Sequence, residues 1–162
     1  MLKLLKKLLF DTQLQRKKTF LKSLSLFKDL RDRELGQLAQ TLHSRTYHAG
    51  ETLFLEGDIG RALFILESGK VELSRRDASG KTRPLFTVEP GGFFGEMALL
   101  EQLPRNASAA AAERSQVYLL YRSKLDVLLH YHPRIAASIM SHLAQLLSAR
   151  LRKLPEAALK DG

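Results

Sequence analysis

The sequence has no cysteine among its 162 residues. This excludes a disulfide framework and a thiolate metal site, and it fits a cytoplasmic protein. Long hydrophobic runs are also missing, because no segment approaches the ~18 apolar residues that a membrane-spanning helix needs. Lysines interrupt the apolar N-terminal stretch, so we expect no secretory signal there. The chain length suits one domain with a proper hydrophobic core.

Acidic residues do not balance the basic ones, and the net charge is +9. The excess is uneven along the chain. Residues 1–22 carry seven Lys and Arg against Asp11, residues 23–133 carry fourteen residues of each sign, and residues 134–162 carry five Lys and Arg against two acids. The middle of the chain is therefore neutral. The basic character belongs to the two ends, so we do not expect a body that binds nucleic acid.

A glycine-rich stretch in the middle of the chain has the composition of an anion site. It runs Gly91-Gly92-Phe93-Phe94-Gly95-Glu96-Met97-Ala98-Leu99-Leu100, and a loop then leads to Pro104-Arg105-Asn106-Ala107-Ser108. Glycines let the backbone approach a ligand closely, and the first N–H groups of a short helix have no intrahelical acceptor. Arg105 could hold an anion through two parallel hydrogen bonds, whereas the Glu96 carboxylate would accept from sugar hydroxyls. The pattern therefore predicts a compact ligand with a phosphate and a hydroxyl.

This order of residues resembles the phosphate-binding cassette of the cyclic-nucleotide-binding domain family. The resemblance is carried by Phe94-Gly95-Glu96, Ala98-Leu99, Pro104-Arg105 and Ala107-Ser108. It implies that Glu96 binds the ribose 2′-hydroxyl and that Arg105 binds the cyclic phosphate, with the Gly95 and Ala98 amides and Ser108 completing the phosphate site. The residues expected at the ligand are Phe94, Gly95, Glu96, Met97, Ala98, Arg105, Asn106, Ala107, Ser108 and Arg150. The alternative is a tight turn whose Glu and Arg bind nothing.

The resemblance leaves the base of the nucleotide open. In the family the residue after the arginine often separates the two bases, with Ala for adenine and Thr for guanine. Asn106 matches neither. Its side chain would either accept from the guanine amino group or point to solvent. We favour cAMP over cGMP as the ligand, and we expect no cofactor and no metal.

Between residues 45 and 121 the sequence alternates short apolar runs with turn residues. The runs lie at 47–49, 52–55, 62–66, 71–74, 85–88 and 116–121. Strands of this length and spacing predict an all-β sandwich, barrel or jelly roll. Residues 107–112 are mostly alanine and alone would favour a helix, but the resemblance places a strand there, and we predict a strand. The resemblance covers about residues 25–150, with family-like turns at 49–51, 56–58 and 68–71.

Helical patterns flank the predicted strands. Asp32 has the position of a cap for a helix that carries Leu35, Leu38 and Leu42. Ser123 and Asp126 have the spacing of a capping box for a second helix that ends near His130. We therefore predict an α+β fold that is mainly β: an antiparallel, jelly-roll-like β-roll with N-terminal helices and two C-terminal helices.

A longer helix is predicted from Pro133 to about Leu154. It carries the coiled-coil-like stripe Met140, Leu143, Leu147, Arg150 and Leu154, and a second apolar face formed by Ile135, Ile139 and Leu146. Two faces suggest one against the body and one against another subunit, so we expect a homodimer. In the alternative interpretation the roll covers both faces.

The N-terminal residues 2–10 form an amphipathic helical pattern. Leucines at 2, 4, 5, 8 and 9 share one face, and Lys3, Lys6 and Lys7 share the other. A basic amphipathic helix is typical of a membrane-surface or partner contact. Four interpretations stay open: the leucines pack on the body, they lie in a dimer, they contact a partner protein, or they contact a membrane. A membrane contact would make the cytoplasmic protein peripheral to that membrane.

We expect three segments along the chain. Residues 1–24 form a basic amphipathic extension, residues 25–154 form a cyclic-nucleotide-binding domain, and residues 155–162 form a short tail. Within the domain the roll covers about 45–121, and the hinge and lid helices cover 123–154. His132 precedes a proline and resists the α conformation, which favours a hinge there. Arg150 on the lid helix either stacks on the purine or belongs to the dimer stripe.

Three classes of function compete for this sequence. Transcription factors of the catabolite-activator type follow their long helix with a helix-turn-helix domain, but only eight residues follow Leu154. We therefore expect a stand-alone cyclic-nucleotide sensor that regulates a partner protein. The alternative is a structural or interaction module with an empty site or another ligand. A metal-dependent β-roll enzyme is not expected, because His130 and His132 lie at a helix junction and a zinc site needs at least three ligands in one cavity.

Overall fold

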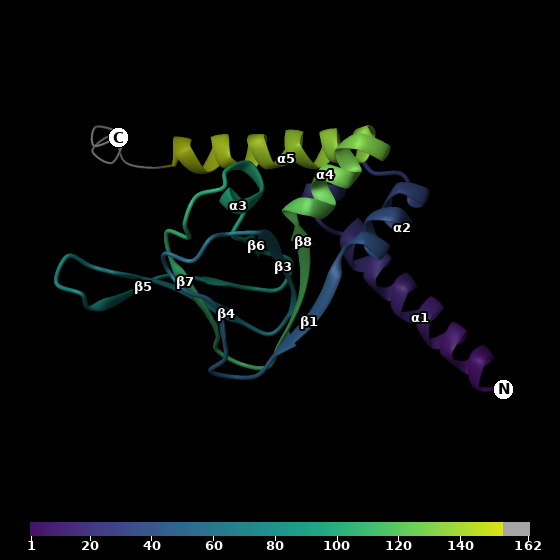
Figure 1. Ribbon diagram of the computed structural model, residues 1–162, viewed down its shortest axis with the longest axis horizontal. Helices are drawn as coiled ribbons and strands as arrows, with labels where there is room; N and C mark the ends of the chain where they lie inside the picture. Colours follow the sequence, from purple (N-terminus) through teal and green to yellow (C-terminus); the bar gives the residue numbers. More distant parts are fainter. Residues whose placement is uncertain (154–162) are drawn as a thin grey trace. The chain divides into compact units, whose positions relative to one another are not determined.

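The computed structural model describes residues 1–153, except for the side chains of Lys3 and Ala98 (Figure 1). In chain order the elements are α1 (Leu2–Lys22), the 3₁₀ helix η1 (Ser25–Phe27), α2 (Asp32–Thr41), β1 (His43–Tyr47), β2 (Thr52–Phe54), β3 (Ala62–Ser68), β4 (Val71–Arg76), β5 (Thr82–Val88), β6 (Phe93–Phe94), α3 (Met97–Leu100), β7 (Ser108–Ala111), β8 (Ser115–Tyr121), α4 (Arg122–Tyr131) and α5 (Pro133–Arg152). Leu154 and the predicted tail at 155–162 lie outside the described residues. None of the helices in the described part of the chain is long and apolar enough to span a bilayer.

The chain forms two compact units, which differ from the predicted segments. The helical unit comprises Met1–Gly36 and the chain from Leu128 onward, and the roll unit comprises Gln37–Val127. The helices before the roll therefore group with those after it, because η1 contacts both α1 and α5. The sequence pattern placed η1 and α5 in one domain with the strands and separated α1 from them.

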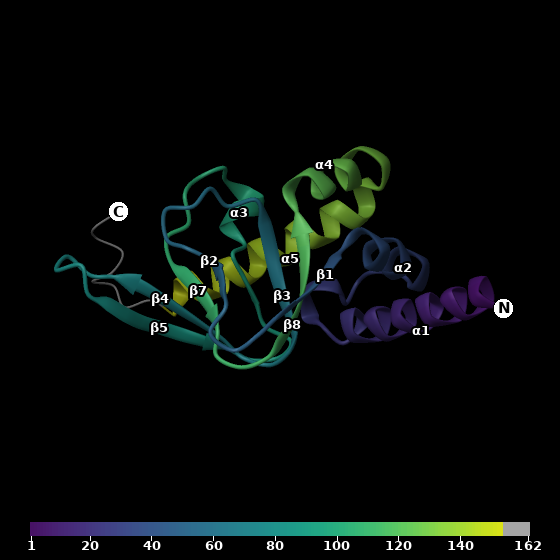
Figure 2. The same cartoon turned by 60° about the horizontal axis from the view of Figure 1, so that its bottom comes forward.

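Two antiparallel sheets of four strands each make up the roll unit, as predicted (Figure 2). The strand orders are β1-β8-β3-β6 and β2-β7-β4-β5. Side chains from both sheets meet in one hydrophobic core, which contains Tyr47, Ala62, Phe64, Leu66, Val71, Leu73, Val88, Phe94, Ala107, Ala109, Ala111, Val117 and Leu119. This core lies directly beneath the residues of the predicted cassette, because Phe94 and Ala107 belong to it.

The alanine segment forms strand β7, which confirms the predicted strand. β7 lies between β2 and β4 and pairs with both. Its Ala109 and Ala111 side chains are buried in the core. Two ladders of hydrogen bonds and a buried face outweigh the helix preference of alanine, which is worth at most ~0.7 kcal/mol per residue over an ordinary residue. The two-residue strand β6, which pairs with β3, was not predicted.

Both predicted N-cap residues lie inside their helices and not before them. α2 begins at Asp32 itself, so Asp32 lies in the first turn. The Arg31 N–H just before it donates to the Glu34 carboxylate at 2.7 Å, which supplies the capping contact from inside the helix. α4 begins at Arg122, so Ser123 also lies within the first turn.

The amphipathic pattern belongs to α1, a continuous helix of 21 residues. Its six large apolar side chains at positions 2, 4, 5, 8, 9 and 10 are 52–72% exposed. The interpretation that these leucines pack on the body is therefore wrong. The end of α1 is anchored through buried Leu21 and the ion pair between Lys18 Nζ and Asp32 Oδ2 at 2.6 Å.

The long helix α5 begins at Pro133, as predicted, and is described as far as Arg152. Two side-chain contacts join it to the N-terminal part of the helical unit. Arg134 pairs with Glu34, and His142 Nε2 lies 3.1 Å from Asp29 Oδ2. Hydrogen bonds from the Arg31 N–H and from Arg134 lower the pKa of the Glu34 carboxyl.

The predicted dimer stripe on α5 is not an open face. Leu143 is fully buried within the chain, Met140 and Leu147 are half-buried, and Arg150 is exposed. The expectation that nothing in the chain covers this stripe is therefore wrong for Leu143. The homodimer itself stays a prediction.

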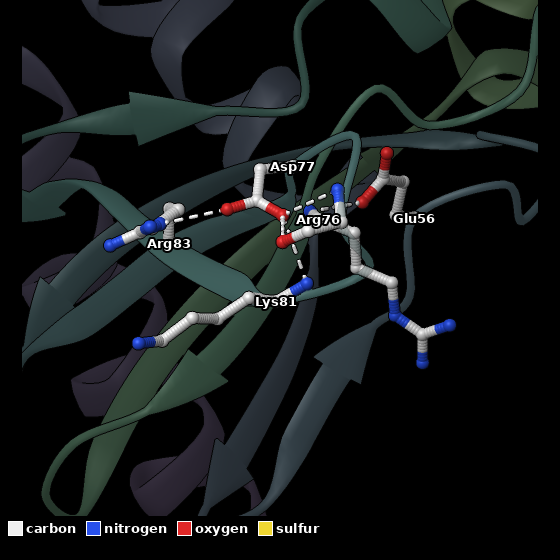
Figure 3. Close-up of polar contacts among 6 residues, drawn as sticks. Glu56, Arg76, Asp77, Lys81 and Arg83 are labelled. Atoms are coloured by element: carbon white, nitrogen blue, oxygen red, sulfur yellow. Dashed lines mark hydrogen bonds and ion pairs between the residues drawn. The ribbon is translucent and has the colours of Figure 1, made fainter.

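The β4–β5 hairpin projects from the other strands of the roll unit in both views (Figures 1 and 2). Asp77 closes it by accepting hydrogen bonds from the Ser79 and Lys81 N–H groups at 2.9 and 3.0 Å, and from Arg83 Nε at 2.9 Å (Figure 3). The Ser79 hydroxyl, and then Arg83, lower the pKa of Asp77 to about 2. β5 is an edge strand, which accommodates Pro84 because an edge tolerates a missing N–H.

Candidate functional site

Gly95 sets the local geometry of the predicted cassette. It follows β6 and has φ = +72°, a left-handed conformation that glycine adopts without steric cost. A Cβ atom at this position would lie 2.5 Å from Arg105 Nη1 and 3.4 Å from the Ala62 carbonyl oxygen. Both the backbone conformation and the close approach of the guanidinium therefore require glycine here.

The helical turn after Gly95 presents backbone N–H groups. Glu96 is the N-cap of α3, and its carbonyl accepts the Leu99 N–H at 3.0 Å. The N–H groups of Met97 and Ala98 belong to the first turn, which has no intrahelical acceptors for them. Glu96 thus directly precedes two backbone N–H donors in the chain.

Arg105 is oriented by two backbone carbonyls. Its Nη1 donates to the Gly95 oxygen at 3.0 Å, and its Nη2 donates to the Ala62 oxygen at 2.9 Å. A guanidinium has five N–H donors. These two bonds to neutral acceptors leave three donors to bind an anion, and they fix the plane in which those donors lie.

Aromatic rings lie under the same guanidinium. Arg105 Cζ lies 4.2 Å from the centroid of the Phe54 ring and 5.5 Å from that of Phe64. Phe64 stacks on Phe94, with ring centroids 5.2 Å apart. Since Phe94 is only 1% exposed, its side chain supports the site from the core and a ligand could meet only its backbone.

The electrostatic setting of Arg105 favours an incoming anion. Burial lowers the pKa of the guanidinium, while the carboxylates of Asp58 and Glu96 oppose this shift. Arginine stays protonated in proteins at physiological pH. A partly desolvated cation held by neutral carbonyls gains more from an added negative charge than an exposed one does.

The loop 55–58 holds the backbone of the cassette. The Gly57 N–H donates to the Arg105 carbonyl at 2.8 Å, and the Arg105 N–H donates to the Asp58 carbonyl at 2.7 Å. The Glu56 N–H donates to Ser108 Oγ at 2.9 Å. Because Ser108 Oγ acts as an acceptor in that bond, its own hydrogen remains available to an anion.

The Glu56 side chain connects this loop to the hairpin. Its Oε2 accepts the Arg76 N–H at 2.9 Å (Figure 3). Its Oε1 lies 3.8 Å from Arg75 Nε. In the sequence, Glu56-Gly57-Asp58 indicates only a turn. The roles of this loop, the Ala62 carbonyl and the Phe54 ring were not predicted, because all three act through backbone groups or distant packing.

Three other predicted residues occupy different settings. Asn106 is exposed at the border of the site, and its Nδ2 lies 3.4 Å from the sulfur of Met97, which is about half exposed. Ala107 is buried in the core. Arg150 belongs to the helical unit, on the exposed side of α5, and its role at a ligand stays a prediction.

The metal-enzyme alternative gains no support from the geometry. Within residues 1–153, no three His, Asp or Glu side chains are placed to share a metal ion. The groups that converge in the roll unit are instead an arginine, a glutamate, a serine and backbone amides. This donor set suits a phosphorylated sugar rather than a metal.

The fold and the site together define a β-roll domain with a cassette built on Gly95, Glu96 and Arg105. The chain belongs to the cyclic nucleotide-binding domain family, whose model matches residues 44–132. The matched range includes both sheets almost completely and the whole cassette.

Individual relatives agree with this assignment. The chain is 37% identical over 133 residues to the cyclic AMP receptor protein of Thermus thermophilus, covering 82% of this chain and 60% of the relative. It is 36% identical over 124 residues to a cAMP-dependent protein kinase regulatory subunit of Eremothecium gossypii, covering 76% of this chain and 25% of the relative. The chain thus spans only part of the length of these relatives.

Solved structures share the fold. A crystal structure of a cyclic nucleotide-binding domain from Methylobacillus flagellatus has a TM-score of 0.78 at 26% sequence identity, covering 88% of this chain and 80% of that one. The agreement extends the family assignment from the sequence to the arrangement of the elements.

Proposed function

We propose that this chain is a sensor for a 3′,5′-cyclic purine nucleotide and that it regulates a partner protein. The observation that carries the proposal is Arg105, a half-buried cation that two carbonyls and an aromatic ring hold beside the first turn of α3. This geometry suits the single negative charge of a cyclic phosphate. The proposal gives the chain no catalytic step and no metal.

Each group of the cassette has a role in this proposal. Arg105 binds the exocyclic oxygens of the cyclic phosphate, and the Gly95 and Ala98 amides and the Ser108 hydroxyl donate to the same group. Glu96 accepts from the ribose 2′-hydroxyl. A carboxylate is suited to this task because it accepts hydrogen bonds without donating any. Met97 and Asn106 border the site on the side of the base.

cAMP is the ligand that we propose over cGMP. The two relatives described above are named for cAMP. The Asn106 amide donates to the sulfur of Met97, and in this proposal it does not bind the guanine amino group. If Asn106 does not contact the base, Asn106→Ala should leave the preference unchanged. Competition between the two nucleotides for wild type and this variant measures the preference, and a tenfold advantage for cGMP would overturn this part of the proposal.

Signalling in this proposal passes from the cassette to α4 and α5. Arg122 on α4 donates from Nη1 to the Leu99 carbonyl on α3 at 2.7 Å. His132, between α4 and α5, has φ = −136° and ψ = 57°, so the two helices meet at a non-helical joint, as predicted. A ligand that repositions α3 can therefore act on α4, and the joint allows α5 to respond as a lid.

Isothermal titration of the full chain with cAMP and cGMP tests the proposal. We expect saturable binding in wild type. Arg105→Ala should weaken it by roughly 30-fold or more, since removing one partner of a buried charge pair costs about 2–5 kcal/mol. Glu96→Ala should cost less, because it removes one hydrogen bond from a hydroxyl to a carboxylate, worth about 1.5–3 kcal/mol. Wild-type protein that shows neither heat nor a thermal shift at millimolar nucleotide would instead favour the structural-module alternative.

A further inference from the structure

The N-terminal half of α1 carries an apolar face that the proposed sensor function does not use. Leu2, Leu4, Leu5, Leu8 and Leu9 are exposed. Phe10 is exposed as well, but at 100° per residue it falls on the side of the lysines. A contiguous apolar patch of this kind on a helix marks an interaction site rather than ordinary surface. In both views the first turns of α1 reach beyond the other helices of the helical unit (Figures 1 and 2).

The positions of these residues on the helix separate two faces. At 100° per residue the five leucines fall within an arc of about 160°. Lys6 and Lys7 project from the opposite arc, and both are exposed. A helix with this division can lie flat on a surface, with its leucines inserted and its lysines extended toward charged groups at the same level.

Charge identifies the surface that this helix fits. Residues 1–22 carry seven Lys and Arg against one Asp, whereas residues 23–133 are neutral. A second copy of α1 would bring another strongly basic segment against the first one, and the neutral middle of the chain offers no acidic excess to attract it. An anionic bilayer supplies both the negative charge and the apolar layer beneath it.

The anchoring of α1 is compatible with a bilayer contact. Leu21 is buried, and Lys18 pairs with Asp32, so the end of α1 is fixed within the helical unit. The exposed leucines all lie at least nine residues before Lys18. We propose that residues 2–10 of α1 bind the surface of a bilayer rich in anionic lipid. The cassette is not needed for this contact.

Flotation of the full chain with lipid vesicles tests the proposal. The vesicles are phosphatidylcholine alone, or phosphatidylcholine with about a third of phosphatidylserine. We expect at least tenfold stronger binding to the anionic vesicles, since each Lys or Arg near such a surface contributes about fivefold in partitioning. Binding should fall when the salt concentration is raised, because screening shortens the range of the attraction.

Variants separate the two contributions. Leu5→Gln with Leu9→Gln should abolish binding to both kinds of vesicle, and Lys6→Gln with Lys7→Gln should reduce the preference for anionic vesicles by more than tenfold. The matched control is Lys28→Gln with Lys124→Gln, two exposed lysines outside α1 with the same loss of charge, and it should keep most of the binding. Circular dichroism of each variant verifies that the fold is intact.

Three outcomes would overturn the proposal. The first is no binding of wild type to either kind of vesicle. The second is equal loss of binding in the Lys28/Lys124 control and the Lys6/Lys7 variant. The third is a dimer in lipid-free solution that Leu5→Gln with Leu9→Gln converts to monomer, because a second copy of the chain would then cover the leucine face.

Discussion

Arg105 is positioned by groups from three separate stretches of the chain. Carbonyls of Ala62 and Gly95 orient the guanidinium, the Phe54 ring lies beneath it, and the loop 55–58 holds its backbone. Such an arrangement fixes the direction of the remaining donors before a ligand binds, which reduces the entropy cost of binding. The residues that place an arginine can therefore matter as much to affinity as further direct contacts.

Glu56 is the most informative of these supporting residues. Its carboxylate accepts a hydrogen bond from the Arg76 N–H, and its own N–H donates to the Ser108 hydroxyl. The N–H of the next residue donates to the Arg105 carbonyl. We expect Glu56→Gln to weaken nucleotide binding about three- to tenfold, because a neutral acceptor holds the loop less firmly than a charged one, by about 1 kcal/mol. We expect little loss of folding stability. Titration calorimetry and thermal melts measure the two effects.

The control for Glu56→Gln is Glu72→Gln, which removes an exposed carboxylate from neighbouring strand β4. It should leave the affinity unchanged. If both variants bind nucleotide as wild type does, the link from the loop to the hairpin does not position the site. If Glu56→Gln only unfolds the protein earlier and binds normally when folded, the carboxylate is structural alone.

Sequence patterns indicated the proposed ligand-binding residues but not the groups that support them. Glu96, Arg105 and Ser108 are found by their spacing to Gly95, because a cassette is a local motif. The Ala62 carbonyl gives no sequence signal, since every residue has a carbonyl. In the sequence Phe54 has the pattern of an ordinary core residue, and nothing there indicates its contact with the Arg105 guanidinium.

At the scale of elements, the strands and helices were predicted with their types correct and their ends shifted. β7 needed the family resemblance, because the alanines alone favour a helix and the pairing with β2 and β4 is non-local. β6 was missed because only two residues pair, next to three glycines. The division into two units could not be predicted, since it depends on contacts between residues about a hundred positions apart.

The β4–β5 hairpin provides a test of stability against pH. The pKa of Asp77 in the folded protein, about 2, lies below its usual value of 3.8. Its stabilising contribution is therefore complete above about pH 4 and is lost as the pH falls toward 2. We expect Asp77→Asn to lower the melting temperature at pH 7, and the difference from wild type to shrink steadily below pH 4.

Thermal melts of wild type and Asp77→Asn between pH 3 and 7 measure this difference. Asp11→Asn, an exposed aspartate on α1, is the control and should melt as wild type does at every pH. A difference that stays constant down to pH 3 would mean that the bonds to Ser79 and Arg83 do not depend on the charge of Asp77.

At the scale of the whole molecule, the self-association of the chain is still a prediction. Because Leu143 is already buried, a dimer through α5 would rest on half-buried Met140 and Leu147 and would bury less area than the sequence suggested. We expect sedimentation at micromolar concentration to give about twice the monomer mass of 18.3 kDa.

Substitution on α5 tests where such a dimer forms. Leu147→Gln should shift the sedimenting mass to that of the monomer, whereas Ala144→Gln, at an exposed position of the same helix, should not. A single 18.3 kDa species for wild type contradicts the dimer. A dimer that survives Leu147→Gln uses another surface.

The response of the helices to ligand is the remaining question at this scale. α4 runs continuously from the roll unit into the helical unit, where the Arg134–Glu34 and His142–Asp29 pairs join α5 to the N-terminal segments. If the ligand moves α5, the segment 29–34 should respond with it. A complete shift from 1:99 to 99:1 would need about 5.5 kcal/mol of differential affinity. The Arg122–Leu99 bond is worth about 1.5–3 kcal/mol at most, so we expect a partial shift.

Hydrogen exchange with and without cAMP measures this coupling. Wild type should gain protection at 94–108 and change its exchange at 128–152 and 29–34. Arg122→Gln should keep the protection at 94–108 but lose most of the change in the helices, because it removes the charged donor to the Leu99 carbonyl. Lys124→Gln, an exposed residue on the same helix with the same loss of charge, should respond as wild type does. Protection confined to 94–108 in wild type would mean that the site fills without moving α5. An undiminished response in Arg122→Gln would mean that the coupling takes another route through the roll.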